Sequence, residues 1–244
     1  MVSLNGGGFT SAVAAWVRLR DYLAQDVLGG PRVAKLATVI NVQKGGTLLW
    51  CLALMSVHNN YSPTAVTYTA LHGSYGLCWL LKELLFPDPS WQVRVTLGGA
   101  ATAVLTVLGP YWLIPYWCIS SHHEASPAVL LGASLTYVVG VVLMMCSDCQ
   151  KFFVLRAQKT KSLITDGCFS RIRHPNYLGE MMVYGSFAAV SGDARSFIIC
   201  GYVWALLFIP NMLRKEQSMS RYKEWKDYCV RAGFLWPKVR DLFK

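Results

Sequence analysis

The chain has 244 residues, of which 54% are hydrophobic and 15% are charged. This balance is that of a membrane protein and argues against a soluble domain. The formal net charge of +10 does not require a nucleic-acid partner, because basic loops at a membrane face account for it. Binding of a polyanion is the less favoured alternative.

The first 34 residues form an amphipathic segment. They contain the stretch FTSAVAAWVRLRDYLAQDVL, in which Arg18, Arg20, Asp21 and Asp26 interrupt the apolar residues. A helix that lies in the membrane interface fits this pattern better than a cleaved secretory signal, which needs an uninterrupted apolar core. The two aspartates also count against a mitochondrial transit segment. No G-x-G-x-x-G follows a strand pattern, so a Rossmann cofactor site is not expected.

From residue 35 onward, long apolar stretches alternate with short polar breaks. Stretches of about 20 apolar residues span a bilayer, and in lipid they must be helices because open strands leave backbone groups unbonded. We therefore predict an all-α fold, a polytopic transmembrane helix bundle of about six crossings, formed by one domain over residues 35–244. The predicted crossings are residues 45–57 with a start as early as about 36, 64–85, 95–119, 127–147, a shorter one at 176–191, and 195–213.

Basic residues are distributed unequally among the breaks. Residues 58–63, 120–127 and 191–194 contain no Lys or Arg, whereas residues 148–174 and the tail from Arg214 are basic. The positive-inside rule then places both termini and the 148–174 loop on the cytosolic face. We expect the membrane to be that of the endoplasmic reticulum, with a mitochondrial membrane as the alternative. The basic residues of this loop are Lys151, Arg156, Lys159, Lys161, Arg171 and Arg173.

The eight cysteines do not form the pattern of a secreted disulfide framework, because most of them fall inside predicted crossings. The CSDC sequence at 146–149 has a spacing compatible with zinc. The other candidate ligands, His122 and His123, are expected on the opposite face of the membrane. We therefore predict no metal site.

The stretch SRIRHPNYLGEMMV, residues 170–183, places a polar cluster directly before an apolar helix. His174 is driven toward extended geometry by Pro175, which itself suits the first turn of a helix. The free N–H groups and dipole of that helix favour a phosphate or carboxylate, and Arg171 and Arg173 can add charge-assisted contacts. Arginines that only reach lipid headgroups are the structural alternative. The dense set that favours a ligand site comprises Arg173, His174, Asn176, Tyr177 and Glu180.

These motifs resemble the steroid 5-alpha-reductase C-terminal-domain superfamily, and most closely its poorly characterised membrane branch. The likeness covers about residues 35–238. Sterol reductases share the RHPNYLG signal, and isoprenylcysteine and phospholipid methyltransferases share the Arg-His-Pro with the following Tyr and Gly. The segments that carry the likeness are LHGSYGLCWLLKELLFPD, SDCQK, LITDGCFS, RHPNYLGE, LRKEQSMSRYKEWKDYC and the final FLWP.

The resemblance implies a cofactor pocket that opens to the cytosolic face. Lys151 is expected to meet a phosphate, and the set from Arg173 to Glu180 is expected to line the cofactor. One departure is that Gln150 and Lys151 are followed by FFVLR, which moves Arg156 one place late relative to the reductase pattern. The residues expected to close the pocket from the tail are Arg214, Glu216, Tyr222, Trp225 and Tyr228.

Two cofactors compete under this resemblance. NADPH carries several phosphates and needs several cations, whereas S-adenosylmethionine carries one carboxylate beside a sulfonium. The Gln-Lys segment and the basic loop favour NADPH, so we expect a membrane reductase that transfers hydride to a carbon–carbon double bond of a lipid or sterol-like substrate. The alternatives are a methyltransferase of a lipid or lipidated substrate, and a non-catalytic accessory subunit of a membrane complex. Polar residues retained in lipid favour a ligand-binding protein.

Hydride transfer must be matched by a proton, and the candidate acids lie in the predicted helix 64–85. At about 100° per residue, His72, Tyr75 and Glu83 project within one arc, together with aromatic residues that we expect to pack against other helices. A carboxylate within a membrane is costly, which makes Glu83 a functional candidate. We therefore hypothesise an acid pair of Tyr75 and Glu83, with His72 as a relay or direct donor.

Overall fold

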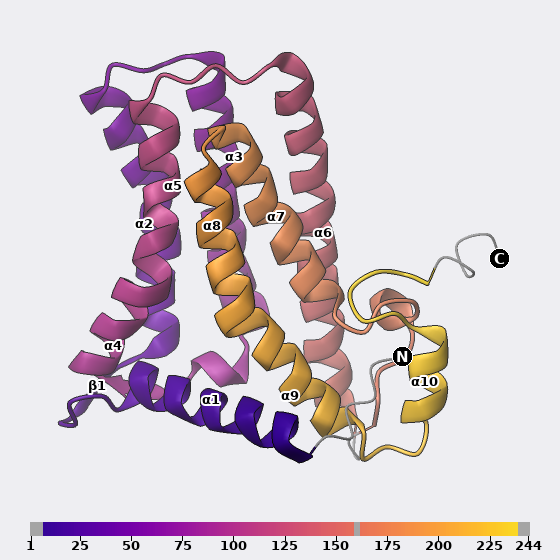
Figure 1. Ribbon diagram of the computed structural model, residues 1–244. Coiled ribbons are helices and arrows are strands. Elements are labelled where there is room, and N and C mark those ends of the chain that lie inside the picture. Colours follow the sequence, from indigo (N-terminus) through magenta and orange to yellow (C-terminus); the bar gives the residue numbers. More distant parts are fainter. Residues whose placement is uncertain (1–6, 159–161, 239–244) are drawn as a thin grey trace.

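The computed structural model describes residues 7–158 and 162–238, and it is mostly helical (Figure 1). Lys159 and Lys161 of the predicted basic loop lie outside the described residues. The elements are α1 (Gly7–Gln25), β1 (Arg32–Lys35), α2 (Leu36–Val57), α3 (Pro63–Leu85), η1 (Pro89–Trp91), β2 (Arg94–Thr96), α4 (Leu97–Ala103), η2 (Val104–Leu108), α5 (Gly109–Ser120), α6 (Pro127–Ala157), η3 (Gly167–Phe169), α7 (Pro175–Ser191), α8 (Ala194–Val203), η4 (Trp204–Phe208), α9 (Ile209–Met219) and α10 (Trp225–Arg231).

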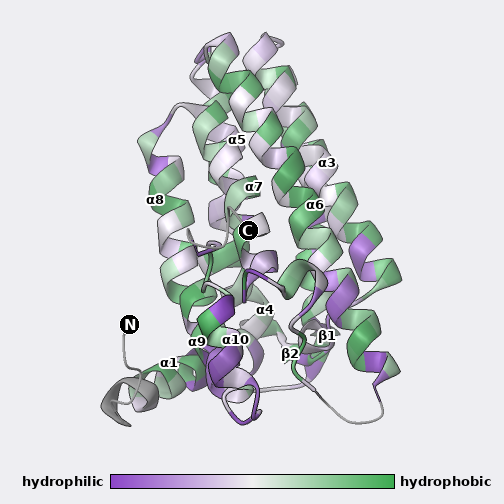
Figure 2. Ribbon diagram, turned by 90° about the vertical axis from the view of Figure 1, so that its right-hand side faces the viewer, coloured by the Kyte–Doolittle hydropathy of each residue, from purple (hydrophilic) through white to green (hydrophobic). Residues whose placement is uncertain are grey.

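Three helical segments of the described chain are long and apolar enough to cross a membrane: Leu97–Ser120, Pro127–Ala157 and Ala194–Met219. They coincide with three of the predicted crossings. The other three predicted crossings correspond to α2, α3 and α7, which run beside these segments in the bundle (Figure 1). Hydrophilic residues gather at the end of the bundle where β1, β2 and α10 lie, while hydrophobic residues cover much of the remaining helix length (Figure 2).

One part of the fold departs from the all-α prediction. Strands β1 and β2 pair antiparallel, with Arg32 opposite Thr96 and Lys35 opposite Arg94. The strands have four and three residues. Such short segments carry no period-2 pattern that sequence inspection can recognise. This two-stranded sheet joins the start of α2 to the start of α4 at the polar end of the bundle.

Helices α3 and α6 begin at proline-bearing breaks in the sequence. Ser62 and Ser126 each precede a proline at the first helical position and accept a hydrogen bond from the backbone N–H three residues later, each at 3.3 Å. The serine satisfies one N–H of the first turn, and proline removes another that would have no partner. The starts of α3 and α6 are therefore set by local chemistry at the break itself.

α1 lies across the polar end of the bundle and packs on α4 and α9 (Figure 1). Pro210 has no N–H, so it cannot donate to the Leu206 carbonyl four residues earlier, and the π-helical turn η4 occurs at this point. Trp16 of α1 donates its indole N–H to that carbonyl at 2.9 Å. The Leu206 carbonyl, which Pro210 leaves without a helical donor, thus anchors α1 to the apolar segment Ala194–Met219.

α6 and α7 approach each other closely at two glycines. A Cβ on Gly140 would lie 2.8 Å from the Gly179 carbonyl oxygen, and a Cβ on Gly179 would lie 2.6 Å from the Gly140 carbonyl oxygen. Small residues at such a crossing let two backbones pack directly in lipid. This contact fixes α7, which carries the RHPNYLGE motif at its start, against α6.

Gly179→Ala should destabilise the protein by about 1 to 3 kcal/mol, because the added methyl group meets backbone atoms that cannot move independently. Gly185→Ala on the same helix is the matched control, since no atom lies within 4 Å of a Cβ at that position. Equilibrium unfolding in mixed micelles measures both variants. Equal stabilities of the two variants would contradict a direct backbone contact at Gly179.

Candidate functional site

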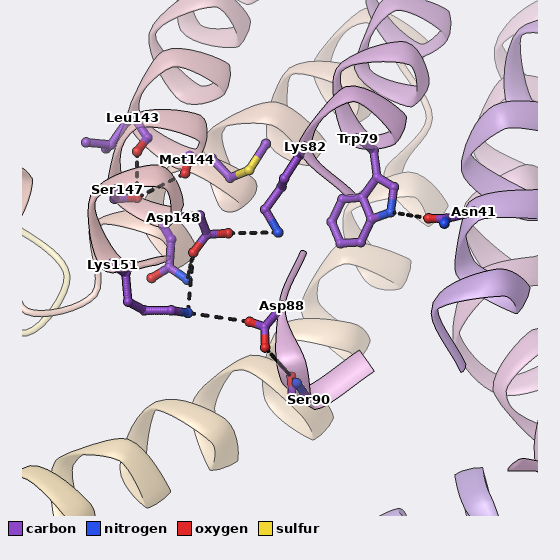
Figure 3. A network of polar contacts seen from close by, with 11 residues as sticks. Asn41, Trp79, Lys82, Asp88, Ser90, Leu143, Met144, Ser147, Asp148 and Lys151 are labelled. Atoms are coloured by element: carbon purple, nitrogen blue, oxygen red, sulfur yellow. Dashed lines mark hydrogen bonds and ion pairs between the residues drawn. The ribbon is translucent and has the colours of Figure 1, made fainter. Parts of the chain in front are cut away.

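A chain of alternating charges lies at the polar end of the bundle. Figure 3 shows its charged members, Lys82, Asp88, Asp148 and Lys151. We call these four residues, together with Asn176, the Asp148 network. Asp148 Oδ2 lies 3.0 Å from Lys82 Nζ, and Asp148 Oδ1 lies 3.6 Å from Lys151 Nζ. Lys151 Nζ also lies 3.4 Å from Asp88 Oδ2, and Asn176 donates to Asp148 Oδ1 at 3.2 Å. The network joins α3, α6, α7 and the loop after α3.

Local structure fixes the loop member of this network. Asp88 accepts hydrogen bonds from the backbone N–H and the hydroxyl of Ser90, at 2.9 and 2.7 Å. Burial alone raises the pKa of Asp88, but the Lys151 ammonium and the Ser90 hydrogen bonds outweigh it and lower this pKa to about 2. Asp88 is therefore an ionised carboxylate that accepts hydrogen bonds from Ser90 in its own loop and from Lys151 of α6.

A pocket of about 470 Å³ opens beside the Asp148 network. This volume is within the range of small-molecule sites. Three cations, Lys82, Lys151 and Arg156, line it together with the two aspartates of the network. Its apolar walls include Phe86, Phe152 and Leu155. The pocket combines positive charge with apolar surface, as a site for a ligand with anionic and flat parts requires.

The arginine and histidine of the RHPNYLGE motif contact Glu216 of α9. Arg173 Nε and His174 Nε2 each lie 2.9 Å from Glu216 Oε1. Arg173 also donates to the Ala232 carbonyl at 2.6 Å. Burial lowers the pKa of His174 and outweighs the opposing effect of Glu216, so a neutral ring donates to the carboxylate. We call Arg173, His174 and Glu216 the Glu216 clamp, which ties the start of α7 to the tail.

The tail is held by further contacts at the same place. The Tyr228 hydroxyl donates to the Phe169 carbonyl at 2.7 Å, and the Arg173 guanidinium lies 5.7 Å from the Trp225 ring centre. Gly233 donates its backbone N–H to the Arg171 carbonyl. Of the residues expected to close the pocket, Glu216 and Trp225 thus contact the motif, and Tyr228 contacts Phe169 shortly before it.

Two other expected tail residues have different contacts. Arg214 lies 3.4 Å from Asp21 of α1, and Tyr222 accepts a hydrogen bond from its neighbour Arg221. Within the described part of the chain, neither side chain forms a hydrogen bond or ion pair with the Asp148 network or the Glu216 clamp. Tyr177 of the motif packs under the Lys215 ammonium, which lies 4.6 Å from its ring centre.

The candidate acids of α3 are separated in the structure. Tyr75 is fully buried, and its hydroxyl has no hydrogen-bond partner within the described protein. His72 bonds to Tyr68 at 2.9 Å and stacks on Phe187 at 4.2 Å. Glu83 accepts from Gln92 at 2.6 Å, and eight residues of helix place it about 12 Å along the axis from Tyr75. The structure does not bring Tyr75 and Glu83 together.

Sequence inspection did not single out Lys44, Lys82, Asp88 or Tyr184 as functional. Lys44 of α2 is only 6% exposed and donates to the Tyr184 hydroxyl. Lys82 is 3% exposed. Lys44 lies directly before the predicted crossing 45–57, and Lys82 lies near the end of the predicted crossing 64–85. Burial of a lysine at such a position is costly and is therefore a signal of its own.

No described group of three or more His, Cys, Asp or Glu side chains, over residues 7–158 and 162–238, is placed to hold a metal ion. The eight cysteines are free. Cys146 is exposed and Cys149 is partly buried.

Residues 104–231, just over half of the chain, match the family described as a protein of unknown function (DUF1295). The protein therefore belongs to the DUF1295 family. No curated protein matches the chain significantly. The matched region includes Asp148, Lys151, the RHPNYLGE motif and Glu216, whereas Lys44 and Lys82 precede it.

The low pKa of Asp88 gives a pH-dependent expectation. Because the pKa falls from 3.8 to about 2 on folding, the stabilisation is complete above about pH 4 and is lost as the pH falls through 2. Asp88→Asn should therefore cost about 2 kcal/mol at neutral pH, and the cost should shrink as the pH falls. Thermal unfolding of both proteins in detergent between pH 2 and 7 measures this. A cost that does not vary with pH would show that Asp88 is not stabilised as a carboxylate.

Proposed function

We propose that this protein is a membrane reductase that uses NADPH to reduce a carbon–carbon double bond of a lipid or sterol-like substrate. The observation that carries the proposal is the pocket lined by Lys82, Lys151 and Arg156 beside the start of α7. The resemblance of the motifs to the steroid 5-alpha-reductase C-terminal-domain superfamily supports the same class. We propose the endoplasmic reticulum as its membrane.

The residues present fit the charges of this cofactor. Arg156 and Lys151 supply cations for phosphate groups at the pocket, and the first N–H groups of α7 favour an anion nearby. Phe86 and Phe152 supply apolar walls for flat rings. NADPH, when bound, supplies the hydride. The role of the Glu216 clamp in this proposal is to hold the start of α7 in position, because its charged groups already pair with one another.

We propose Tyr75 as the proton donor of the reaction. Its hydroxyl is buried and has no partner in the described protein, so a proton on it is available to a bound molecule. Glu83 is engaged by Gln92 and His72 by Tyr68. Of the three predicted acids, only Tyr75 is therefore proposed to donate the proton. Glu83 and His72 have structural roles.

A methyltransferase that binds S-adenosylmethionine is the second candidate, and one observation favours it. Lys82 and Lys151 already pair with Asp148 and Asp88, so only Arg156 among the pocket cations has no ion pair within the described residues. A ligand with a single carboxylate needs fewer cations than NADPH. The binding experiment below separates the two cofactors, and binding of neither would favour a non-catalytic accessory subunit.

Arg156→Met should weaken NADPH binding by about 1 to 3 kcal/mol, because a charge-assisted contact to phosphate is lost. Arg221→Met is the matched control, since Arg221 is an exposed arginine that contacts Tyr222 in the tail. Isothermal titration of the detergent-solubilised protein with NADPH and with S-adenosylmethionine measures both affinities. Binding of S-adenosylmethionine without NADPH binding would exclude the reductase.

Tyr75→Phe should slow single-turnover oxidation of bound NADPH by a lipid extract about 100-fold or more, which is the usual contribution of a general acid. Glu83→Gln should leave this rate nearly unchanged, because the Glu83 side chain bonds to Gln92. Stopped-flow absorbance of the nicotinamide follows the reaction, with cofactor affinity measured in parallel. A Tyr75→Phe rate equal to wild type would remove Tyr75 as the proton donor.

The six-crossing arrangement belongs to the same proposal, since it places the pocket at the cytosolic face. Ser121→Cys and Lys226→Cys, both at exposed positions, should label from opposite sides of sealed vesicles. The background for this test carries Cys146→Ser, because Cys146 is exposed. Labelling of both introduced cysteines from one side would exclude an arrangement in which the 120–127 break and the tail lie on opposite faces.

A further inference from the structure

Lys44 is the centre of a polar cluster of which the proposed chemistry uses only Tyr75. Its ammonium nitrogen lies 4.7 Å from the ring centre of Tyr75, 4.8 Å from Tyr184, 5.1 Å from Trp79 and 5.7 Å from Tyr111. We call these five residues the Lys44 cluster. Lys44 lies eight residues after the first residue of α2, about 12 Å along the helix axis. The cluster is therefore well inside the bundle.

The ammonium of Lys44 has aromatic partners but no carboxylate partner. It donates a hydrogen bond to the Tyr184 hydroxyl, and no ion pair within 4.0 Å joins it to an acidic side chain of the described residues. The aromatic faces stabilise a cation without neutralising it. A charge buried in this way is costly unless an anion accompanies it.

Further polar atoms of this region lack partners. The hydroxyl groups of Tyr75 and Tyr111 and the side-chain oxygen of Gln43 are buried, and none of them has a hydrogen-bond partner in the described protein. The three side chains are 0%, 3% and 5% exposed respectively. Buried polar groups in native proteins are normally bonded, so two donors without acceptors beside a buried ammonium are an exception that requires an explanation.

We propose that the Lys44 cluster binds the carboxylate of a fatty-acid-like lipid. A carboxylate has four acceptor sites, and it can accept from the Lys44 ammonium and from the Tyr111 hydroxyl together, which leaves the Tyr75 hydroxyl to act as the proposed proton donor. It also supplies an anion in direct contact with the ammonium, which no carboxylate of the described residues does. The inference deepens the proposed function and rests on it for the chemistry, because it names the substrate class as an unsaturated lipid that bears a carboxylate.

Trp79 of the cluster lies near a lysine that lines the pocket. The Lys82 ammonium, which lines the pocket, lies 4.8 Å from the Trp79 ring centre, and the Lys44 ammonium lies 5.1 Å from the same ring. Trp79 itself donates to Asn41 at 3.1 Å, as Figure 3 shows. One indole therefore joins the cation-lined pocket to the Lys44 cluster.

Glu180 is the rival partner for Lys44. It lies on α7 one turn before Tyr184, and its charge acts on Lys44, but the two do not form an ion pair within 4.0 Å among the described contacts. If Glu180 alone neutralised the charge of Lys44, the carboxylate of a bound lipid would add no binding free energy at the cluster. This alternative predicts that a fatty acid and its alcohol bind equally.

The test compares oleate with oleyl alcohol, which has the same chain and double bond but no charge. The full chain in phosphatidylcholine nanodiscs, without NADPH, is titrated with each probe while thermal unfolding is followed by tryptophan fluorescence. Wild type should be stabilised more by oleate than by oleyl alcohol. Lys44→Met should weaken oleate binding about tenfold or more and remove this preference. Lys35→Met, at an exposed position in β1 directly before α2, should retain it.

A second variant keeps the test decisive if Lys44→Met does not fold. Tyr111→Phe removes a buried hydroxyl that has no partner, so the protein without oleate should be at least as stable as wild type. The same variant should bind oleate several-fold more weakly. If the hydroxyl had only a structural role, its removal would not keep the stability without oleate while weakening oleate binding.

Equal stabilisation of wild type by oleate and oleyl alcohol, or unchanged oleate binding in Tyr111→Phe, would overturn the proposal. Because NADPH is absent from this experiment, failure of the carboxylate site is distinguishable from failure of the reductase, which the cofactor titration measures separately.

Discussion

The carboxylate of Asp148, held between two lysines at the polar end of a helix bundle, is the interaction on which the candidate site depends. Asp148 forms ion pairs with Lys82 of α3 and Lys151 of its own helix, and it accepts a hydrogen bond from Asn176 of α7. Removal of one partner from a buried ion pair leaves an uncompensated charge and is strongly destabilising. These contacts therefore constrain where α3 and α7 meet α6, and they place the cation-lined pocket at that junction.

Two further constraints complete the junction. The direct contact of Gly140 and Gly179 sets the distance between α6 and α7, so that Asn176 can reach Asp148. The Glu216 clamp then ties the first residues of α7 to α9 and the tail. Backbone packing sets the position of the helices, and hydrogen bonds to charged groups set their ends.

Much of the helical pattern could be predicted from the sequence, because apolar length and proline-bearing breaks are local signals. The starts of α3, α6 and α7 follow directly from Ser-Pro or His-Pro sequences. The RHPNYLGE motif likewise indicated a polar site at the start of α7. Strands β1 and β2 could not be predicted, since their pairing joins residues far apart in the chain.

The partners of the charged residues could not be read from the sequence. Arg173 was expected to face a cofactor, but in the structure its nearest charged group is Glu216. On α3, neighbouring positions differ by about 100° around the helix, and Lys82 rather than Glu83 is the buried residue, at 3% exposure. A sequence gives the charge of each side chain, whereas its partner is decided by which helices pack together.

The most direct test of the central role of Asp148 is a thermodynamic double-mutant cycle with Lys82→Met and Asp148→Leu. Unfolding free energies of the two single variants, the double variant and wild type are measured in mixed micelles. Each single variant should lose about 3 kcal/mol, and the double variant should lose clearly less than their sum, because it leaves no unpaired charge at this contact. Additive losses in the double variant would contradict a stabilising interaction between Lys82 and Asp148.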